Sequence, residues 1–141
     1  MSLIYWDTML FVYLLEGHPE HSTRVKRILT RMEQRKDTLC TSIFTIGELL
    51  VTPYRLQAFQ AIQKIREAMR PPSVEILPFA AGTAERYAAI RAELRVSPAD
   101  AIHLACAAEA GADVFLTNDQ KLAGRIVPGI QFIVGMDSNL F

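Results

Sequence analysis

The feature that most constrains this chain is a repeated switch in hydrophobic pattern, from short apolar runs to longer segments with helical periodicity. Within one such segment, Val25, Ile28 and Met32 mark one apolar face of a helix. Short runs that fit buried strands lie at residues 3–6, 39–42, 74–77, 113–117 and 131–134. Alternating strands and helices, with strands apolar on both faces, are typical of parallel sheets. We therefore expect an α/β three-layer sandwich, with a central, mostly parallel sheet of about five strands flanked by helices.

Length and charge limit the possibilities further. A chain of 141 residues has room for one ordinary domain with a substantial core, so we expect residues 1–141 to form a single domain. Fifteen basic residues balance fifteen acidic ones, so binding to a polyanion would need a local basic patch. The longest apolar run, at 9–15, is shorter than the roughly 20 residues that span a bilayer and lacks signal-peptide features. Cys40 and Cys106 lie in apolar runs as expected free thiols, which favours a cytoplasmic protein.

Local signals predict where the helices begin and end. Thr8 is expected to cap the apolar helix that follows it, and Ser42 to cap the helix that carries Glu48. Pro53 is expected to interrupt that second helix. Ser97 begins a Ser-Pro-Ala-Asp cap, which places a proline at the first helical position of the last helix.

Four acidic residues lie at or near predicted strand ends or helix starts: Asp7, Glu48, Asp100 and Asp119. Asp7 and Asp119 come directly after strands, Glu48 lies in the second turn after the second strand, and Asp100 lies in the first turn of the helix that begins at Pro98. Ligands of open α/β sheets bind beyond the carboxyl ends of the strands, so these side chains are expected to converge there. Carboxylates brought close together repel one another unless a cation lies between them. Hard oxygen ligands without an accompanying His and Cys set favour Mg²⁺ or Mn²⁺.

Each acid also has a simpler interpretation on its own. Asp100 fits the last position of the helix cap, and Glu48 fits an exposed helix residue. Asp119 fits the N-cap of a short helix over residues 120–124. Asp7 is harder to explain in this way, because an unpaired carboxylate between a strand and an apolar helix is costly. The set as a whole favours a metal site.

Taken together, these residues resemble the pattern of the PIN domain, and the layout resembles the VapC-type toxins of bacterial and archaeal toxin–antitoxin pairs. The resemblance covers essentially the whole chain and rests on Asp7-Thr8, IGELL at 46–50, DAIHLACA at 100–107 and LTNDQKL at 116–122. It implies metal-dependent RNA cleavage by a homodimer that a protein antitoxin restrains. Met9 departs from the pattern, because the family often has a small polar residue there.

By this resemblance, Asp7, Glu48, Asp100 and Asp119 form the acidic metal-binding and catalytic quartet, supported by Thr8, Thr117 and Asn118. The resulting hypothesis is a Mg²⁺- or Mn²⁺-dependent endoribonuclease that hydrolyses RNA phosphodiester bonds as the toxin of a type II toxin–antitoxin pair. Glu48 would bind the metal or take a proton from the attacking water. The alternative is a catalytically silent PIN-like module that binds RNA or a protein.

Two rival enzyme classes fit less well. An aspartyl phosphatase would need a second acid soon after Asp7, and a receiver domain would need an acceptor acid after the third strand; neither is present. His103 lies among apolar residues and fits a structural histidine bonded to a neighbour, while His18 and His21 lack zinc-protease spacing.

Two segments leave a choice between surface and core. A run of basic residues would form either an RNA-binding patch or an ordinary solvated helix face. The run comprises Arg24, Lys26, Arg27, Arg31, Arg35 and Lys36. The apolar helix at 9–15 fits the core, or a surface for a second copy or an antitoxin.

Overall fold

The computed structural model describes residues 1–141 and contains strands and helices in the predicted alternation. The strands are β1 (Leu3–Trp6), β2 (Thr38–Ser42), β3 (Glu75–Leu77), β4 (Val114–Thr117) and β5 (Phe132–Gly135). The helices are α1 (Thr8–Glu16), α2 (Ser22–Arg35), α3 (Ile43–Arg55), α4 (Phe59–Ala68), α5 (Ala81–Glu93) and α6 (Pro98–Ala110). Each predicted strand is present within one or two residues of its expected bounds.

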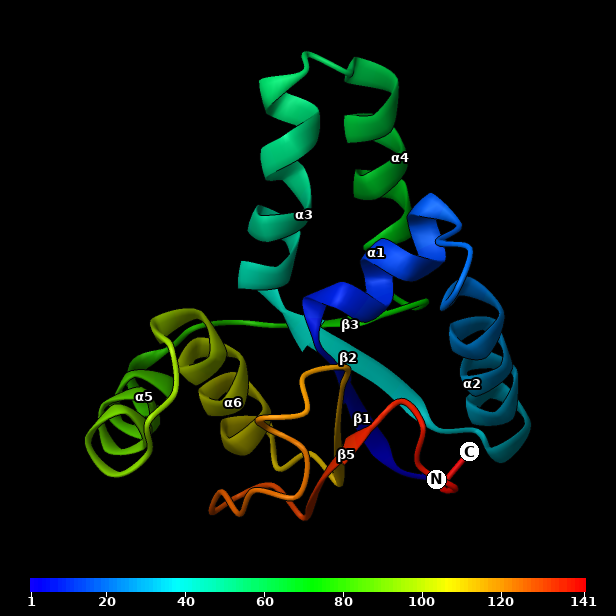
Figure 1. Ribbon diagram of the computed structural model, residues 1–141. Helices are drawn as coiled ribbons and strands as arrows, with labels where there is room; N and C mark the ends of the chain where they lie inside the picture. Colours follow the sequence, from blue (N-terminus) through cyan, green and yellow to red (C-terminus); the bar gives the residue numbers. More distant parts are fainter.

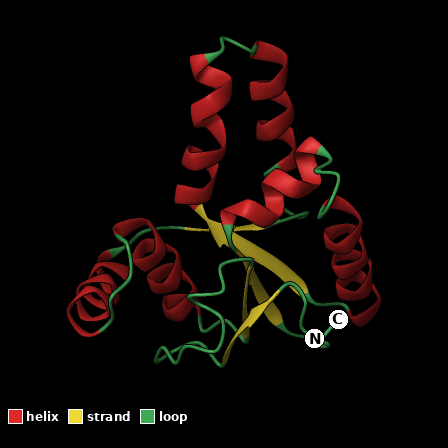
Figure 2. Ribbon diagram, viewed as in Figure 1, coloured by secondary structure: helices red, strands yellow, loops and turns green.

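All five strands join one sheet in the order β3-β2-β1-β4-β5, and every neighbouring pair is parallel (Figures 1 and 2). The expected α/β sandwich is confirmed, with a sheet that is wholly parallel. From β1 the chain adds β2 and β3 on one side, then returns to add β4 and β5 on the other. The order therefore reverses between β1 and β4, where sheets of this kind bind ligands.

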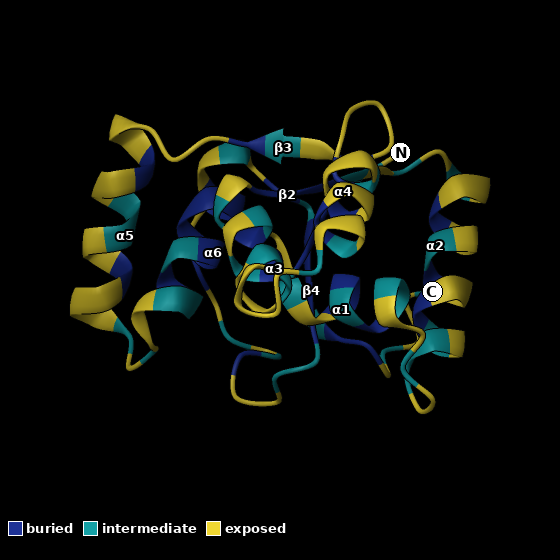
Figure 3. Cartoon of the chain, turned by 90° about the horizontal axis from the view of Figure 1, so that it is seen from above, coloured by how far each residue is buried: buried dark blue, intermediate teal, exposed yellow.

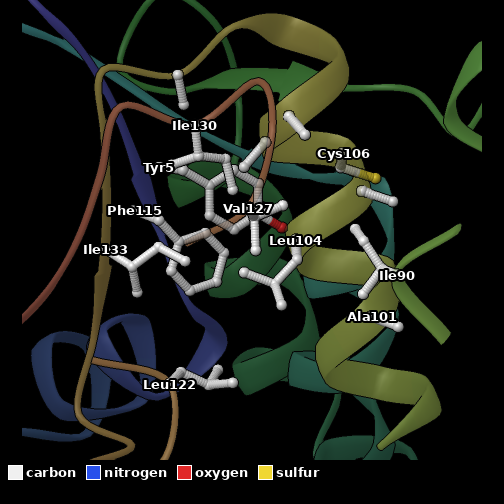
Figure 4. Packing of buried hydrophobic residues seen from close by; sticks show 14 of the residues in the cluster. Tyr5, Ile90, Ala101, Leu104, Cys106, Phe115, Leu122, Val127, Ile130 and Ile133 are labelled. Atoms are coloured by element: carbon white, nitrogen blue, oxygen red, sulfur yellow. The ribbon is translucent and has the colours of Figure 1, made fainter. Parts of the chain in front are cut away.

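The sheet separates two hydrophobic cores, because alternate residues of a strand point to opposite faces. In β1, Ile4 and Trp6 pack with α1 and α2, whereas Tyr5 packs with α6 on the other face. Phe115 of β4 stacks on Tyr5, with ring centroids 5.0 Å apart (Figure 4). The first helices thus cover one face, and α5 and α6 cover the other (Figure 1).

Helices α3 and α4 form a hairpin that projects from the sheet, and much of its tip is exposed (Figures 1 and 3). The prediction that Pro53 interrupts α3 is wrong, since the helix continues to Arg55. A proline removes its own N–H from the helical hydrogen bonds and its ring crowds the carbonyl four residues before it, but the N–H groups that follow it can still donate. Beyond it, Leu56 N donates to Thr52 O at 3.0 Å and Ala58 N to Pro53 O at 2.9 Å. The last turn of α3 therefore closes around the proline.

The helix caps agree with the sequence except at α1. Ser42 Oγ accepts a hydrogen bond from Thr45 N at 3.2 Å, and Ser97 Oγ accepts one from Asp100 N at 3.1 Å. The prediction that Thr8 caps α1 is wrong, because Asp7 has the extended backbone of an N-cap and Thr8 is already helical. This arrangement frees the Thr8 hydroxyl for another partner. No helix of the protein combines the length and apolarity needed to cross a membrane.

Candidate active site

A cavity of about 290 Å³ lies beside the carboxyl ends of β1 and β4, where the strand order reverses. Its walls come from the start of α1, the middle of α3, the start of α6 and the segment after β4. The lining residues are Asp7, Thr8, Met9, Tyr13, Glu48, Ala99, Asp100, His103, Asn118 and Asp119. All four predicted acids therefore face one cavity, although they come from four separate parts of the chain.

Asp7 is held by both of its carboxylate oxygens. Its Oδ1 accepts a hydrogen bond from Thr8 N at 2.8 Å, and its Oδ2 accepts one from Thr117 Oγ1 at 2.8 Å. Its own backbone N–H donates to Leu116 O at 3.0 Å, which ties the end of β1 to β4. An unpaired carboxylate at this position would be costly to bury, but Asp7 is the N-cap of α1 and accepts two hydrogen bonds. These bonds fix its side chain at the cavity wall.

The polar end of β4 holds two acids in place. Thr117 is fully buried and does not line the cavity, but its Oγ1 donates to Asp7 and accepts from Asp119 N at 3.0 Å. Asn118 lines the cavity and donates from Nδ2 to the Tyr13 hydroxyl at 2.8 Å. Thr117 is therefore a support for Asp7 and Asp119, whereas Asn118 lies on the cavity surface.

Asp119 does not cap a helix, because residues 120–124 form turns. Its Oδ1 accepts a hydrogen bond from Lys121 N at 2.9 Å, as an aspartate at a turn commonly does. The simpler interpretation of this residue as a helix N-cap is therefore wrong.

Glu48 is bonded to two side chains that the sequence did not connect with it. Its Oε1 lies 2.6 Å from Thr8 Oγ1 and 2.6 Å from His103 Nε2. On the other side of the imidazole, His103 Nδ1 lies 2.6 Å from the Tyr5 hydroxyl. His103 is buried and bonded to a neighbour, as expected, but it also reaches the cavity wall. The sequence signal for this contact was its place one turn after Asp100 on the same helix.

The acids of the cavity differ in their pKa values. Burial is the largest effect on Asp100 and raises its pKa; the hydrogen bond with Ser97 lowers the pKa by less, and the nearby Asp7 and Asp119 carboxylates raise it further. Burial also raises the pKa of Glu48, but the hydrogen bonds from His103 and Thr8 outweigh it, so the net pKa is lowered. Glu48 is therefore held as an anion, while Asp100 lies in a negative field that a cation would relieve.

The donor set fits a hydrated divalent ion. No group of three or more His, Cys, Asp and Glu side chains is arranged to hold a metal directly. Mg²⁺ keeps several of its water ligands and binds proteins through one or two carboxylates, so several acids that line one cavity without forming a direct ligand cluster suit it. The cavity, at about 290 Å³, is large enough for such an ion, and Asp7, Asp100 and Asp119 lie in its walls.

The predicted basic patch is only partly available. Arg24 donates to Met136 O at 2.7 Å and to Ser138 O at 2.8 Å, and Arg35 donates to Leu140 O at 2.8 Å. The Arg35 guanidinium also lies 4.9 Å from the centre of the Phe141 ring. These two arginines therefore hold the C-terminal segment. The exposed members of the patch are Lys26, Arg27, Arg31 and Lys36.

The apolar helix α1 belongs largely to the core. Leu10, Phe11 and Tyr13 are buried, whereas Met9 is 44% exposed and lines the cavity. The remaining apolar residues of α1 are intermediate in exposure. The helix thus closes one core and forms part of the cavity wall.

Comparison with known proteins decides the family. The family model of the PIN domain matches residues 4–125. The chain belongs to the PIN domain family. This match spans β1 to the segment after β4 and includes every acid of the cavity, while β5 lies beyond it and completes the sheet. No curated protein matches this PIN domain at a significant level.

Solved toxin–antitoxin proteins share the fold of this PIN domain. VapBC2 of Rickettsia felis, bound to a promoter DNA fragment, matches with a TM-score of 0.75 at 19% identity over 94% of this chain and 98% of that one. DNA-bound VapBC of Salmonella typhimurium matches with a TM-score of 0.68 at 24% identity over 96% and 99%. Mycobacterium tuberculosis VapC20, described as a sarcin-ricin loop cleaving toxin, matches with a TM-score of 0.66 at 19% identity over 87% and 96%.

Proposed function

We propose that this PIN domain is a divalent-metal-dependent endoribonuclease and the toxin of a type II toxin–antitoxin pair. The observation that carries the proposal is the convergence of Asp7, Glu48, Asp100 and Asp119 on one cavity at the point where strand order reverses. The structurally similar proteins include toxin–antitoxin complexes and one toxin described as cleaving the sarcin-ricin loop. Residues 1–141 would act as one domain, as a homodimer in the cytoplasm, with a small protein antitoxin as partner.

The roles of the acids follow from their surroundings. Mg²⁺ or Mn²⁺, when bound, supplies a Lewis acid for the scissile phosphate and lowers the pKa of a water molecule. Asp7 and Asp119, linked through Thr117, would hold the ion together with Asp100 across the cavity. Glu48 stays ionised and would either complete the ion's ligands or accept a proton from the attacking water.

A PIN module that binds RNA or a protein without cutting is the second candidate. The observation that favours it is Met9, which places an apolar side chain, 44% exposed, in the cavity wall. Arg24 and Arg35 are also engaged with the C-terminal segment, which leaves fewer cations for RNA.

Cleavage of labelled tRNA and rRNA fragments in Mg²⁺ or Mn²⁺ tests the proposal. Asp100→Asn removes one acid of the cavity, and Asp137→Asn is the matched control, since Asp137 is exposed and lies outside the cavity. We expect cleavage by the unchanged protein and by Asp137→Asn, and its loss in EDTA and in Asp100→Asn. Folded, partner-free protein that binds the metal and cuts none of these RNAs would support the silent module instead.

A further inference from the structure

A row of short hydrogen bonds connects the hydrophobic core to the cavity wall. It begins at Tyr5, which is fully buried and stacked on Phe115. The Tyr5 hydroxyl lies 2.6 Å from His103 Nδ1, and His103 Nε2 lies 2.6 Å from Glu48 Oε1. The first two residues are at most 2% exposed, whereas Glu48 lines the cavity. The row therefore links a fully buried residue of the sheet to an acid of the candidate site.

The partners determine which atom donates in each bond. A carboxylate only accepts hydrogen bonds, so the proton between Glu48 and His103 belongs to Nε2. In the neutral imidazole Nδ1 is then the acceptor, and the Tyr5 hydroxyl donates to it. If the ring carries two protons, Nε2–H still donates to Glu48. The orientation of the imidazole toward the acid is thus the same in both protonation states.

Both donors to Glu48 approach the same oxygen. Thr8 Oγ1 and His103 Nε2 each lie 2.6 Å from Oε1, whereas no hydrogen bond engages Oε2. The Thr8 hydroxyl is placed by the first turn of α1, and His103 by Tyr5. A long, rotatable side chain is thereby fixed with one oxygen left for an ion, a water or the substrate.

We propose that His103 is a positioning residue, which Tyr5 holds in place and which orients Glu48 for metal-dependent cleavage. The proposal rests on the proposed function and adds two residues, Tyr5 and His103, to its machinery. A merely structural histidine would be satisfied by any partner of its polar atoms. A positioning histidine needs the N–H at Nε2 specifically.

Two amide substitutions separate these roles. Glutamine places its amide N–H near the position of Nε2, and asparagine places its amide near the position of Nδ1. His103→Gln therefore keeps a donor for Glu48 and loses the partner of Tyr5, whereas His103→Asn does the reverse. Both variants lose the ring edge contacts with Tyr5 and Phe44, and asparagine is one methylene group smaller than glutamine, so the stability of each variant is measured alongside its activity.

Mn²⁺ affinity by calorimetry and RNA cleavage are measured for both variants, with circular dichroism to establish folding. We expect His103→Asn to lose about 10- to 100-fold in affinity or cleavage, the usual effect of removing a partner that orients a metal-site residue. The Mn²⁺ affinity or the cleavage rate of His103→Gln should exceed that of His103→Asn by at least about tenfold. Folded variants that are equal in both measurements would overturn the proposal.

Imidazole ¹⁵N spectra of the unchanged protein provide a test that needs neither a variant, a metal nor RNA. We expect a protonated Nε2 in His103, and a bare Nε2 would refute the proposal even if the variants fail to fold. The absence of cleavage by the unchanged protein would refute the proposed ribonuclease, while the spectra and the Mn²⁺ titrations still decide whether His103 orients Glu48.

Discussion

Replacing Thr117 with valine removes one hydroxyl from beneath the candidate site while keeping the shape of the side chain. Thr117 is fully buried, and its Oγ1 donates to Asp7 Oδ2 at 2.8 Å and accepts from Asp119 N at 3.0 Å. The change therefore leaves Oδ2 of Asp7 without a donor, while Thr8 N still donates to Oδ1, and it leaves the Asp119 N–H without an acceptor. We expect the metal-free protein to lose stability and the acids to lose their fixed geometry.

The magnitude follows from the two lost bonds. A hydrogen bond to a charged group contributes about 1.5–3 kcal/mol, and one between neutral groups about 0.5–1.5 kcal/mol. The Asp7 side chain is only 13% exposed, so water replaces the first bond poorly, whereas Asp119 is partly exposed and recovers some of the second. We therefore expect a loss of about 2–4 kcal/mol in the free energy of unfolding.

Urea unfolding followed by Trp6 fluorescence measures this loss. Trp6 is the only tryptophan and is fully buried against Phe11. With a urea slope of about 2 kcal/mol/M, a loss of about 3 kcal/mol lowers the midpoint by about 1.5 M. Mn²⁺ affinity, measured on the same protein, should fall as well, because Asp7 and Asp119 are no longer held together.

Thr83→Val is the matched control. Thr83 is 1% exposed, does not line the cavity, and its Oγ1 accepts one hydrogen bond, from Ala80 N at 3.2 Å. It should cost about 1 kcal/mol and leave Mn²⁺ affinity unchanged. If Thr117→Val costs no more than Thr83→Val and binds Mn²⁺ normally, the support role of Thr117 is wrong.

Three further predictions address single groups. Asp7→Asn and Asp7→Ala should both abolish cleavage, but the alanine variant should be less stable by about 1 kcal/mol in urea, because asparagine retains the N-cap of α1. In EDTA, Asp100→Asn should raise the unfolding temperature at pH 7. The folded-state pKa of Asp100 is raised above its ordinary 3.8, so ionising it as pH rises opposes folding, and the advantage of asparagine should disappear well below pH 3.8. Burial raises the thiol pKa of Cys40 to about 12 and that of Cys106 to about 11, so a thiolate-specific reagent at pH 8 should label neither until urea unfolds the protein.

Each of these has a contradicting result. Equal stability of the two Asp7 variants would show that the cap contributes nothing. If Asp100→Asn is no more stable than the unchanged protein at pH 7, then Asp7, Asp100 and Asp119 do not repel one another enough to affect folding. Rapid labelling of folded protein would place Cys40 or Cys106 at an accessible surface.

The sequence predicted the parts of the fold that depend on local patterns. Strand positions followed from short apolar runs, and Ser42 and Ser97 revealed two helix starts. The convergence of the acids also followed, because the carboxyl ends of parallel strands share one edge of the sheet. Asp7 and Asp119 were predicted at the same edge of the sheet because each directly follows an expected strand, whereas the pairing of β1 with β4 is seen only in the structure.

The sequence did not reveal which side chains bond across long separations. Tyr5 and His103 lie 98 positions apart, and Arg24 and Met136 lie 112 apart, so no periodicity connects them. Thr8 was expected to cap α1 because its type suits that position, but its hydroxyl bonds to Glu48 and the cap falls to Asp7. In each case a tertiary partner decided the role that local preference had left open.

The two ends of the chain lie close together near the amino end of β1, away from the edge that carries the cavity (Figure 1). Ser2 N donates to Asp37 Oδ1 at 2.9 Å, and Arg35 binds the backbone of Leu140, so both ends are attached to the same region beside α2. An affinity tag or a surface tether at either end would therefore leave the cavity facing the solution. Joining the two ends with a short linker and opening the chain elsewhere should likewise be compatible with the sheet.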